Sequence, residues 1–165
     1  VKDDFDRMYT VKDLPGLKAR AAEMKEILND LDRLNAFHSR CALDKWLADA
    51  RALGTTPEVK DYYEKNARNL ITTWGGSLND YASRTWAGLI KDYYSKRWDM
   101  YMDAVISAVE GNREFDQKKL DESIKNFEDA WVDSTDPILV APQGELMQYA
   151  RFLLQKYGRR IPENL

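Results

Sequence analysis

The segment TTPEVKDYYEKNARNLITTWGG, residues 55–76, contains the clearest helix boundaries in the sequence. Thr56 is suited to cap a helix N-terminus, Pro57 to occupy the first turn, and Glu58 to lie near the positive end of the helix dipole. At the other end, Gly75 can adopt the left-handed conformation that commonly follows a helix. The segment therefore predicts a helix that begins at about residue 57 and ends before Gly75.

Helical spacing of apolar residues recurs on both sides of this segment, and no stretch keeps the strict alternation of a strand. Downstream, a run from Asn79 to Val109 carries an apolar stripe that is closed by Gly111, and we expect a bend near Ser95. Two further helices are separated by STDPILVAPQG, residues 134–144, a linker rich in turn formers. We predict an all-α fold, a single helical bundle of six or seven helices that forms one domain over residues 1–165.

Composition and charge exclude several classes of protein. A net charge of −3 argues against a nucleic-acid partner, because a phosphate-backbone binder needs a basic face. No apolar run approaches the roughly 18 residues of a membrane helix, so no membrane partner is expected. The sequence begins with Val1 and a polar stretch rather than with methionine and a signal peptide, which we interpret as an excised domain of a longer polypeptide.

Few residues are available for metal or nucleophilic chemistry. The chain has one histidine, His38, and one cysteine, Cys41, whereas a structural zinc site needs about four such ligands. His38 and Cys41 lie three residues apart and could be imagined as a nucleophilic pair, but no third orienting group is evident. Acidic pairs such as Asp61 and Glu64 are expected on solvated helix faces. We therefore predict no metal site and no cofactor. Paired carboxylates among the 28 acidic residues stay open as catalytic groups, although none stands out.

Large aromatic side chains are concentrated between residues 74 and 101. Tyrosine and tryptophan combine a large apolar area with one polar atom, which suits both helix packing and the faces of sugars. Composition alone leaves both interpretations open. The set, here called the aromatic belt, is Trp74, Tyr81, Trp86, Tyr93, Tyr94, Trp98 and Tyr101. Trp74 and Tyr81 flank a turn, which favours a binding role. Trp98 and Tyr101 share the apolar stripe, which favours a place in the core.

Three segments in this order resemble the C-terminal region of glycoside hydrolase family 89, the alpha-N-acetylglucosaminidases. They are LDKWLADARALG, DYYEKNARNLITTWGG and LNDYASRTWAGLIKDYYSKRWDMYMDAV, residues 43–54, 61–76 and 78–105. The resemblance covers roughly residues 43–131, and its turn GGSLND is shorter than the commoner forms in the family. The most specific matches are Asn66, Arg68, Thr73, Trp74, Gly75, Asp80, Tyr81, Ala87, Gly88, Leu89, Tyr93, Tyr94, Arg97 and Trp98.

The resemblance implies an all-α C-terminal domain that follows a small N-terminal domain and a catalytic barrel. In that family, two barrel glutamates remove terminal alpha-linked N-acetylglucosamine by a retaining mechanism, so neither glutamate lies in this chain. The implied partners are the barrel of the same polypeptide and the glycan at the domain boundary, with Trp74 and Tyr81 as the substrate-binding candidates. Arg68 and Arg97 are expected to brace neighbouring helices.

Two hypotheses remain open at this stage. The first is an accessory domain of an alpha-N-acetylglucosaminidase, inactive alone, with an exposed apolar patch where the barrel docks. The second is a self-contained helical module that binds a protein partner through an exposed aromatic belt. The sequence has no Asn-x-Ser/Thr glycosylation site, and together with the resemblance this favours a periplasmic or secreted bacterial protein over a lysosomal one.

Overall fold

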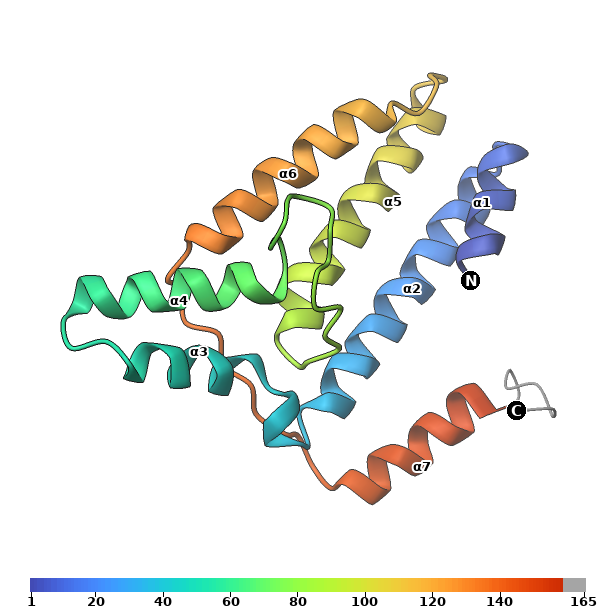
Figure 1. Cartoon of the computed structure of the whole chain (residues 1–165). Coiled ribbons are helices and arrows are strands. Elements are labelled where there is room, and N and C mark those ends of the chain that lie inside the picture. The colour runs from blue at the N-terminus through green and yellow to red at the C-terminus, as the bar shows by residue number, and fades with distance from the viewer. Residues whose placement is uncertain (159–165) are drawn as a thin grey trace.

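The computed structural model of the protein describes residues 1–158 and consists of α-helices joined by loops (Figure 1). Within this range there is no strand, only one isolated bridge between Ala42 and Ala87. A short 3₁₀ helix, Ser39–Cys41, precedes α3, and a π-helical turn, Ile90–Tyr94, precedes α5. The all-α prediction and the predicted number of helices are confirmed: α1 (Lys2–Thr10), α2 (Leu14–Asn35), α3 (Leu43–Ala52), α4 (Pro57–Ile71), α5 (Ser95–Glu110), α6 (Gln117–Asp133) and α7 (Leu146–Tyr157).

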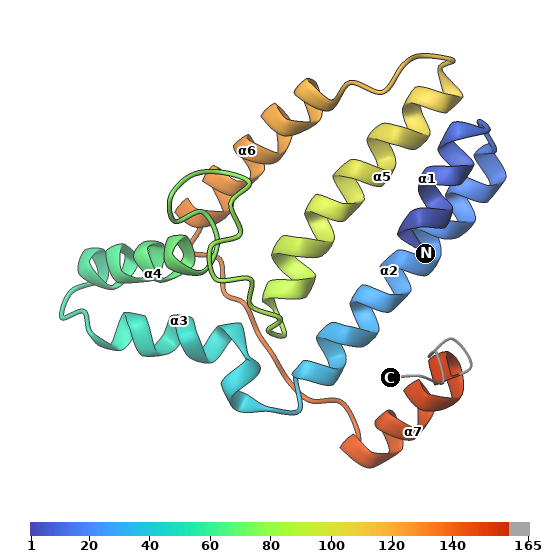
Figure 2. The same cartoon turned by 45° about the vertical axis from the view of Figure 1, so that its right-hand side comes forward.

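The helices are arranged around α2 and α5, which lie side by side in both views (Figures 1 and 2). α1 covers one side of α2, and α6 packs on α5. α3 and α4 form an antiparallel hairpin that contacts α6 through α4. The linker 134–144 then carries the chain from α6 to α7, which packs on α2. No helix within residues 1–158 has the length and apolar character needed to cross a membrane.

The predicted boundaries of α4 are confirmed. The Thr56 side chain accepts a hydrogen bond from the backbone N–H of Val59 at 3.4 Å, and Pro57 occupies the first turn. α4 ends at Ile71, and its C-cap residue Thr72 has a φ of −128°. Gly75 has a φ of +89° and Gly76 a φ of +129°, so the two glycines supply the positive φ angles of the turn that follows, which glycine adopts without steric cost. The Gly75–Gly76 pair is thus part of a sharp turn, as its sequence indicated.

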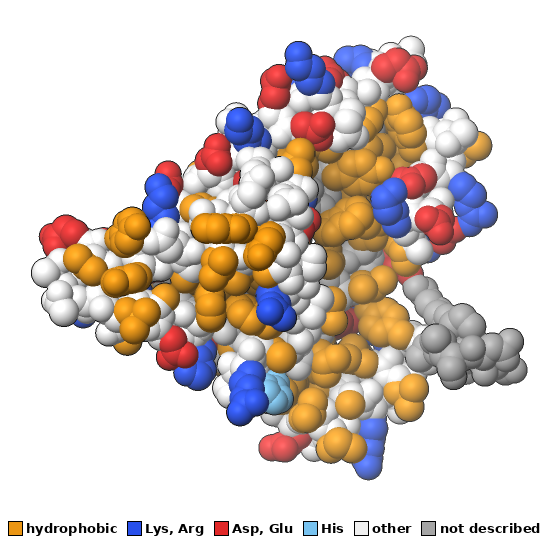
Figure 3. All heavy atoms as spheres, in the orientation of Figure 1, with side chains coloured by type: hydrophobic (Ala, Val, Ile, Leu, Met, Phe, Trp, Pro, Cys, Tyr) orange, Lys and Arg blue, Asp and Glu red, His pale blue; other side chains and the backbone are white. Residues whose placement is uncertain are grey.

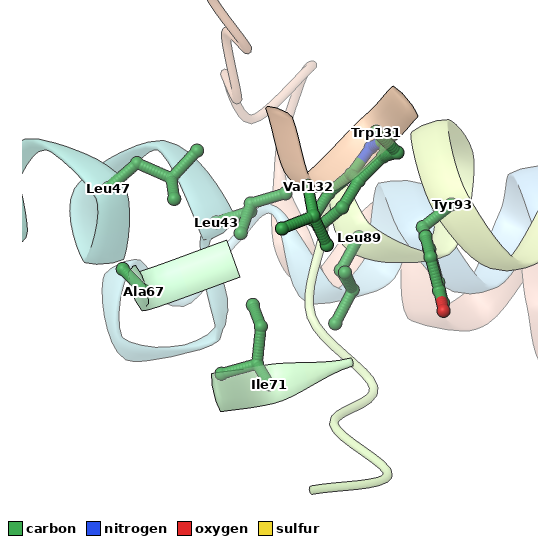
Figure 4. Close-up of a cluster of buried hydrophobic side chains, with 8 residues drawn as sticks. All are labelled: Leu43, Leu47, Ala67, Ile71, Leu89, Tyr93, Trp131 and Val132. Carbon is green, nitrogen blue, oxygen red and sulfur yellow. The ribbon is translucent and has the colours of Figure 1, made fainter. Parts of the chain in front are cut away.

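Two clusters of buried apolar side chains hold the helices together. The first joins α3, α4, α6 and the segment that leads into α5, and the rings of Tyr93 and Trp131 lie with their centroids 4.9 Å apart (Figure 4). The second joins α1, α2 and α5, with Trp98 and Tyr101 packed against it, which confirms that this pair belongs to the core. The buried members are Leu43, Leu47, Ala67, Ile71, Leu89, Tyr93, Trp131 and Val132 in the first cluster, and Phe5, Leu17, Ala21, Met24, Met102 and Val105 in the second.

The prediction of a helix from Asn79 to Val109 is wrong in its first third. The chain is irregular up to Gly88, and the π-helical turn then leads directly into α5. Tyr94 and Ser95 both keep right-handed helical backbone angles, so no cap marks the bend expected near Ser95. Asp32 of α2 accepts hydrogen bonds from the backbone N–H groups of Gly88 at 2.7 Å and Lys91 at 3.1 Å. Backbone N–H groups in the first turn of a helix have no partner within that helix, and here the partner comes from α2. Because the capping residue is distant in the chain, the sequence around Gly88 carries no signal for this helix start.

Candidate functional site

The two predicted site residues project from one segment, residues 72–88, which connects α4 to the π-helical turn and is here called the aromatic turn. Trp74 is 51% exposed and Tyr81 is 60% exposed. Such exposure is unusual for side chains of this size, because tryptophan and tyrosine are mostly buried in folded domains. Figure 3 shows hydrophobic side chains gathered on the same face, over α4 and this turn.

The backbone of the aromatic turn is held in a conformation that residues with side chains rarely adopt. Leu78, Asp80 and Ser83 have φ values of +62°, +46° and +45°. Each left-handed residue other than glycine costs on the order of 1 kcal/mol, so surrounding contacts must maintain the turn. Local hydrogen bonds supply part of this support: the Tyr81 N–H donates to the Thr72 carbonyl at 3.1 Å, and the Asn79 amide donates to the Trp74 carbonyl at 2.7 Å.

The rest of the support comes from a buried carboxylate on α6. Glu128 is fully buried, and its Oε2 accepts the backbone N–H of Leu78 at 2.9 Å. Its Oε1 accepts the Tyr93 hydroxyl at 2.8 Å and lies 3.2 Å from Nη1 of Arg97. Arg97 also forms an ion pair with Asp80 of the turn. A charge buried this deeply is tolerated only when it is paired and hydrogen-bonded, so these four groups form one unit, here called the Glu128 network: Glu128, Tyr93, Arg97 and Asp80.

Two members of this network, Tyr93 and Arg97, have shifted pKa values. Burial raises the pKa of the Tyr93 hydroxyl far above its usual range, and the hydrogen bond to Glu128 raises it further. Burial lowers the pKa of Arg97, but the hydrogen bond to Asp80 and the negative charges of Asp80 and Glu128 together outweigh this, and the net pKa shift is upward. Tyr93 therefore stays neutral and Arg97 stays charged around neutral pH, and the groups serve to hold the turn rather than to transfer protons.

A second buried ion pair braces the helices beneath the turn. Arg68 is almost fully buried; its Nη2 lies 2.6 Å from Oε1 of Glu64 and donates to the Asp136 carbonyl at 3.0 Å. Its guanidinium carbon lies 4.8 Å from the ring centre of Trp131. The predicted bracing roles of Arg68 and Arg97 are confirmed. The assignment of Glu64 to a solvated face is wrong, because this carboxylate is buried between two arginines, Arg51 and Arg68.

Tyr81 also lines a pocket of about 460 Å³ between α3, α4 and the aromatic turn, whereas Trp74 lies outside its lining. The indoles of Trp46 and Trp86 contribute to this pocket with their ring centroids 5.7 Å apart. The structure therefore places the two candidates on the same turn but not in the same hollow. The full lining is Ser39, Arg40, Ala42, Lys45, Trp46, Asp49, Leu70, Ile71, Tyr81, Ala82, Arg84 and Trp86.

The possible nucleophilic pair does not assemble. The Nδ1 atom of His38 accepts the backbone N–H of Arg40 at 3.2 Å, so His38 caps the 3₁₀ helix. Cys41 is a half-buried free thiol at the end of the same helix. Within residues 1–158, no group of three or more histidine, cysteine or acidic side chains is placed to hold a metal ion.

A comparison with protein families decides which family this helical domain represents. The family model described as the alpha-N-acetylglucosaminidase C-terminal domain matches residues 1–156. The chain belongs to this family. The match also covers α1 and α2, whose residues resemble the family in helical character more than in sequence.

Relatives of this family member are several times longer than the chain. Human alpha-N-acetylglucosaminidase is 34% identical over 155 residues, which are 92% of this chain and 21% of the human protein. The family 89 glycoside hydrolase from Clostridium perfringens, solved in complex with 2-acetamido-1,2-dideoxynojirmycin, superposes with a TM-score of 0.82 at 25% identity, covering 94% of this chain and 19% of its own. The same enzyme with GlcNAc-alpha-1,4-galactose gives a TM-score of 0.81 at 24% identity, covering 97% and 20%. The chain thus spans about a fifth of the length of these relatives.

The aromatic belt is divided between core and surface. Tyr93 is fully buried, and Trp86, Tyr94, Trp98 and Tyr101 are half-buried in helix packing. Only the two residues of the turn are largely exposed. The continuous exposed belt that a protein-interaction module would need is therefore absent from the described part of the chain.

The sequence interpretation missed Glu128, the residue that connects the turn to the bundle. One signal was available: Glu128 lies four residues after Ile124 and three before Trp131, so it falls on the apolar stripe of α6. A charged residue on an apolar stripe must find a buried partner. The identity of that partner, the backbone of Leu78, could not be read from the sequence.

Proposed function

We propose that this chain is the C-terminal helical domain of a larger alpha-N-acetylglucosaminidase that removes terminal alpha-linked N-acetylglucosamine from glycans by a retaining mechanism. In this proposal the catalytic glutamates belong to a barrel elsewhere in the polypeptide, and the helical domain packs on that barrel. The domain itself supplies no catalytic group and is inactive alone. The family membership and the fivefold greater length of the relatives support this assignment.

The observation that carries the proposal is the pair of exposed aromatic residues on a turn fixed by the Glu128 network. Trp74 and Tyr81 offer flat apolar faces, and each keeps one hydrogen-bonding atom at the rim. A sugar ring has the complementary arrangement, with an apolar face and hydroxyls at its edge. Because the turn is held by buried hydrogen bonds rather than free to move, the two side chains can form part of a preorganised wall of the sugar pocket.

The exposed surface of α4 fits the same proposal. Val59, Tyr62, Tyr63 and Leu70 are all more than a third exposed, and they lead along the helix toward Trp74. Monomeric proteins rarely leave a contiguous apolar strip of this kind open to water. We interpret the strip as part of the surface against which the barrel packs. The implied compartment is periplasmic or secreted for a bacterial protein, with a lysosomal protein as the alternative.

The test uses the whole polypeptide that carries this chain and a chromogenic terminal alpha-N-acetylglucosaminide. Trp74→Ala is expected to lower kcat/KM by roughly tenfold or more, since a buried aromatic contact contributes about 1.5–3 kcal/mol. Tyr81→Ala is expected to act in the same direction. Phe152→Ala is the matched control, because Phe152 is a comparably exposed aromatic residue at 46% and lies on α7, outside both the aromatic turn and the α4 strip.

If Trp74→Ala and Tyr81→Ala leave kcat/KM at the Phe152→Ala value, the two residues do not form part of the wall of the sugar pocket. Turnover of the substrate by the 165-residue chain alone would contradict the placement of catalysis outside it. Both results can be obtained independently of how the domains pack.

A further inference from the structure

A second hollow lies on the other side of the aromatic turn, between α5 and α6. It has a volume of about 470 Å³ and opens along α5, where Figure 3 shows hydrophobic side chains gathered between α6 and α1. This hollow is here called the α5–α6 groove. Its lining is Lys2, Leu78, Asp80, Tyr94, Arg97, Trp98, Tyr101, Gln117, Leu120, Asp121 and Ile124.

The walls of the groove are apolar and incompletely covered. Leu78 is 42% exposed at the end formed by the turn, and Trp98 and Tyr101 are half-buried along α5. Leu120 and Ile124 complete the opposite wall on α6. The groove is large enough for one or two side chains, and a patch of this kind on a soluble domain marks an interaction surface.

Two polar atoms at the inner wall point to the same conclusion. The Tyr94 hydroxyl and the Nε atom of Arg97 are shielded from solvent, and neither has a hydrogen-bond partner among residues 1–158. Buried polar groups in folded proteins nearly always have a partner, so the inner wall lacks two of the hydrogen bonds that a fully packed interior makes. Because both atoms are already shielded from solvent, a docked segment would cover the wall in front of them rather than bind them directly.

The position of the N-terminal helix indicates which part of the polypeptide lies beside the groove. Lys2, in the first turn of α1, lines the groove, and its Nζ lies 5.7 Å from the ring centre of Tyr101. The Tyr101 hydroxyl donates to Asp6 at 3.0 Å, which fixes the start of α1 against α5. Any polypeptide that precedes Val1 must therefore leave the bundle at the rim of this groove.

We propose, on the basis of the proposed function, that the α5–α6 groove is the seat of a segment from the part of the polypeptide that precedes this domain. The segment places apolar side chains between Trp98 and Ile124 and covers the exposed part of Leu78. Because the relatives are about five times longer and the family is a C-terminal domain, that preceding part is the occupant with both the length and the position to reach the groove.

Docking in this groove also acts on the aromatic turn. Leu78 and Asp80 line the groove, while Trp74 and Tyr81 project from the same turn. The seated segment would cover Leu78 and restrict the left-handed backbone at this position. The groove thereby couples the packing of the two parts of the polypeptide to the orientation of the sugar-facing side chains.

The experiment fills the groove from α6 in the whole polypeptide. Asp121→Trp introduces a bulky ring at a groove-lining position, and Glu122→Trp introduces the same ring at the neighbouring exposed position outside the lining. Asp121→Trp is expected to separate one calorimetric unfolding transition into two and to increase the rate of limited proteolysis before Val1 by roughly tenfold or more. Glu122→Trp is expected to match the unmodified polypeptide in both measurements.

A second variant, Gln117→Trp, is changed at the exposed start of α6 and gives the same information if Asp121→Trp loses helical circular dichroism. If both groove variants match Glu122→Trp, the groove is not the docking seat and the inference is overturned. This outcome is distinct from failure of the proposed function, which would show as the absence of alpha-N-acetylglucosaminidase turnover in the unmodified polypeptide.

Discussion

Removal of the Glu128 carboxylate should be the most damaging single substitution in the bundle. In Glu128→Ala the backbone N–H of Leu78 and the hydroxyl of Tyr93 each lose their acceptor, at 2.9 Å and 2.8 Å in the native structure. Arg97 loses one of its two carboxylate partners and retains Asp80. The aromatic turn then loses its connection to α6.

The size of the effect follows from these contacts. A buried donor left without an acceptor costs about 1–3 kcal/mol, and breaking a buried ion pair costs about 3–5 kcal/mol. Because Arg97 keeps one partner, we expect Glu128→Ala to lower the free energy of unfolding by about 4 kcal/mol. Glu128→Gln keeps one carbonyl acceptor and similar volume, so we expect a loss of about 1–2 kcal/mol.

Urea unfolding of the 165-residue chain, followed by circular dichroism, measures these losses. With a slope of about 2 kcal/mol per M for a chain of this size, the midpoint should fall by about 2 M for Glu128→Ala and by about 1 M or less for Glu128→Gln. Asp129→Ala, changed at the exposed neighbour, is the control and should shift the midpoint little. A Glu128→Ala midpoint within error of the Asp129→Ala value would refute the role assigned to the Glu128 network.

Three further predictions concern the helix restart, alkaline stability and α7. Gly88→Val should lower the melting temperature by several degrees, because Gly88 has a φ of +83° and an added Cβ would lie 3.0 Å from side chains of the linker. Gly76→Val is the control: Gly76 has a φ of +129° but lies in open space, so this variant measures backbone strain alone and should lower the melting temperature less. Burial, with the hydrogen bond to Asp6, raises the pKa of Tyr101 to about 12. The contribution of the neutral hydroxyl to the free energy of unfolding is therefore present below about pH 10 and is lost as the pH rises toward 12. In Tyr101→Phe, the free energy of unfolding should depend less on pH between these values. Asp30 accepts hydrogen bonds from three side chains of α7, so Asp30→Asn should increase hydrogen exchange in residues 146–157 by roughly tenfold, and unchanged exchange would count against this clamp.

The helical architecture could be predicted from the sequence because its signals are local. Thr56 and Pro57 define the start of α4 through capping and ring geometry, and Gly75 supplies a positive φ in the turn after its end. Each of these signals depends on a few neighbouring residues. The apolar stripes of α2 and α6 repeat at helical spacing and identify the buried faces. The exposure of Trp74 and Tyr81 also followed from their position beside a turn.

The interior of the aromatic turn could not be predicted because its determinants are distant in the chain. Asp32 caps the helix restart at Gly88 from 56 residues away, and Glu128 holds Leu78 from 50 residues away. Neither interaction produces a periodic pattern around residues 79–88. The helical spacing of the residues that follow extended the predicted helix into a segment whose backbone groups bond elsewhere.

The central claim is that Trp74 forms part of the sugar-binding wall of a larger enzyme. Calorimetric titration of the whole polypeptide with 2-acetamido-1,2-dideoxynojirmycin, the compound bound to the Clostridium perfringens relative, tests it without relying on turnover. We expect Trp74→Ala to weaken binding by roughly tenfold or more, while the Phe152→Ala control keeps the native affinity. Equal affinities of the Trp74→Ala variant and the unmodified polypeptide would contradict the claim.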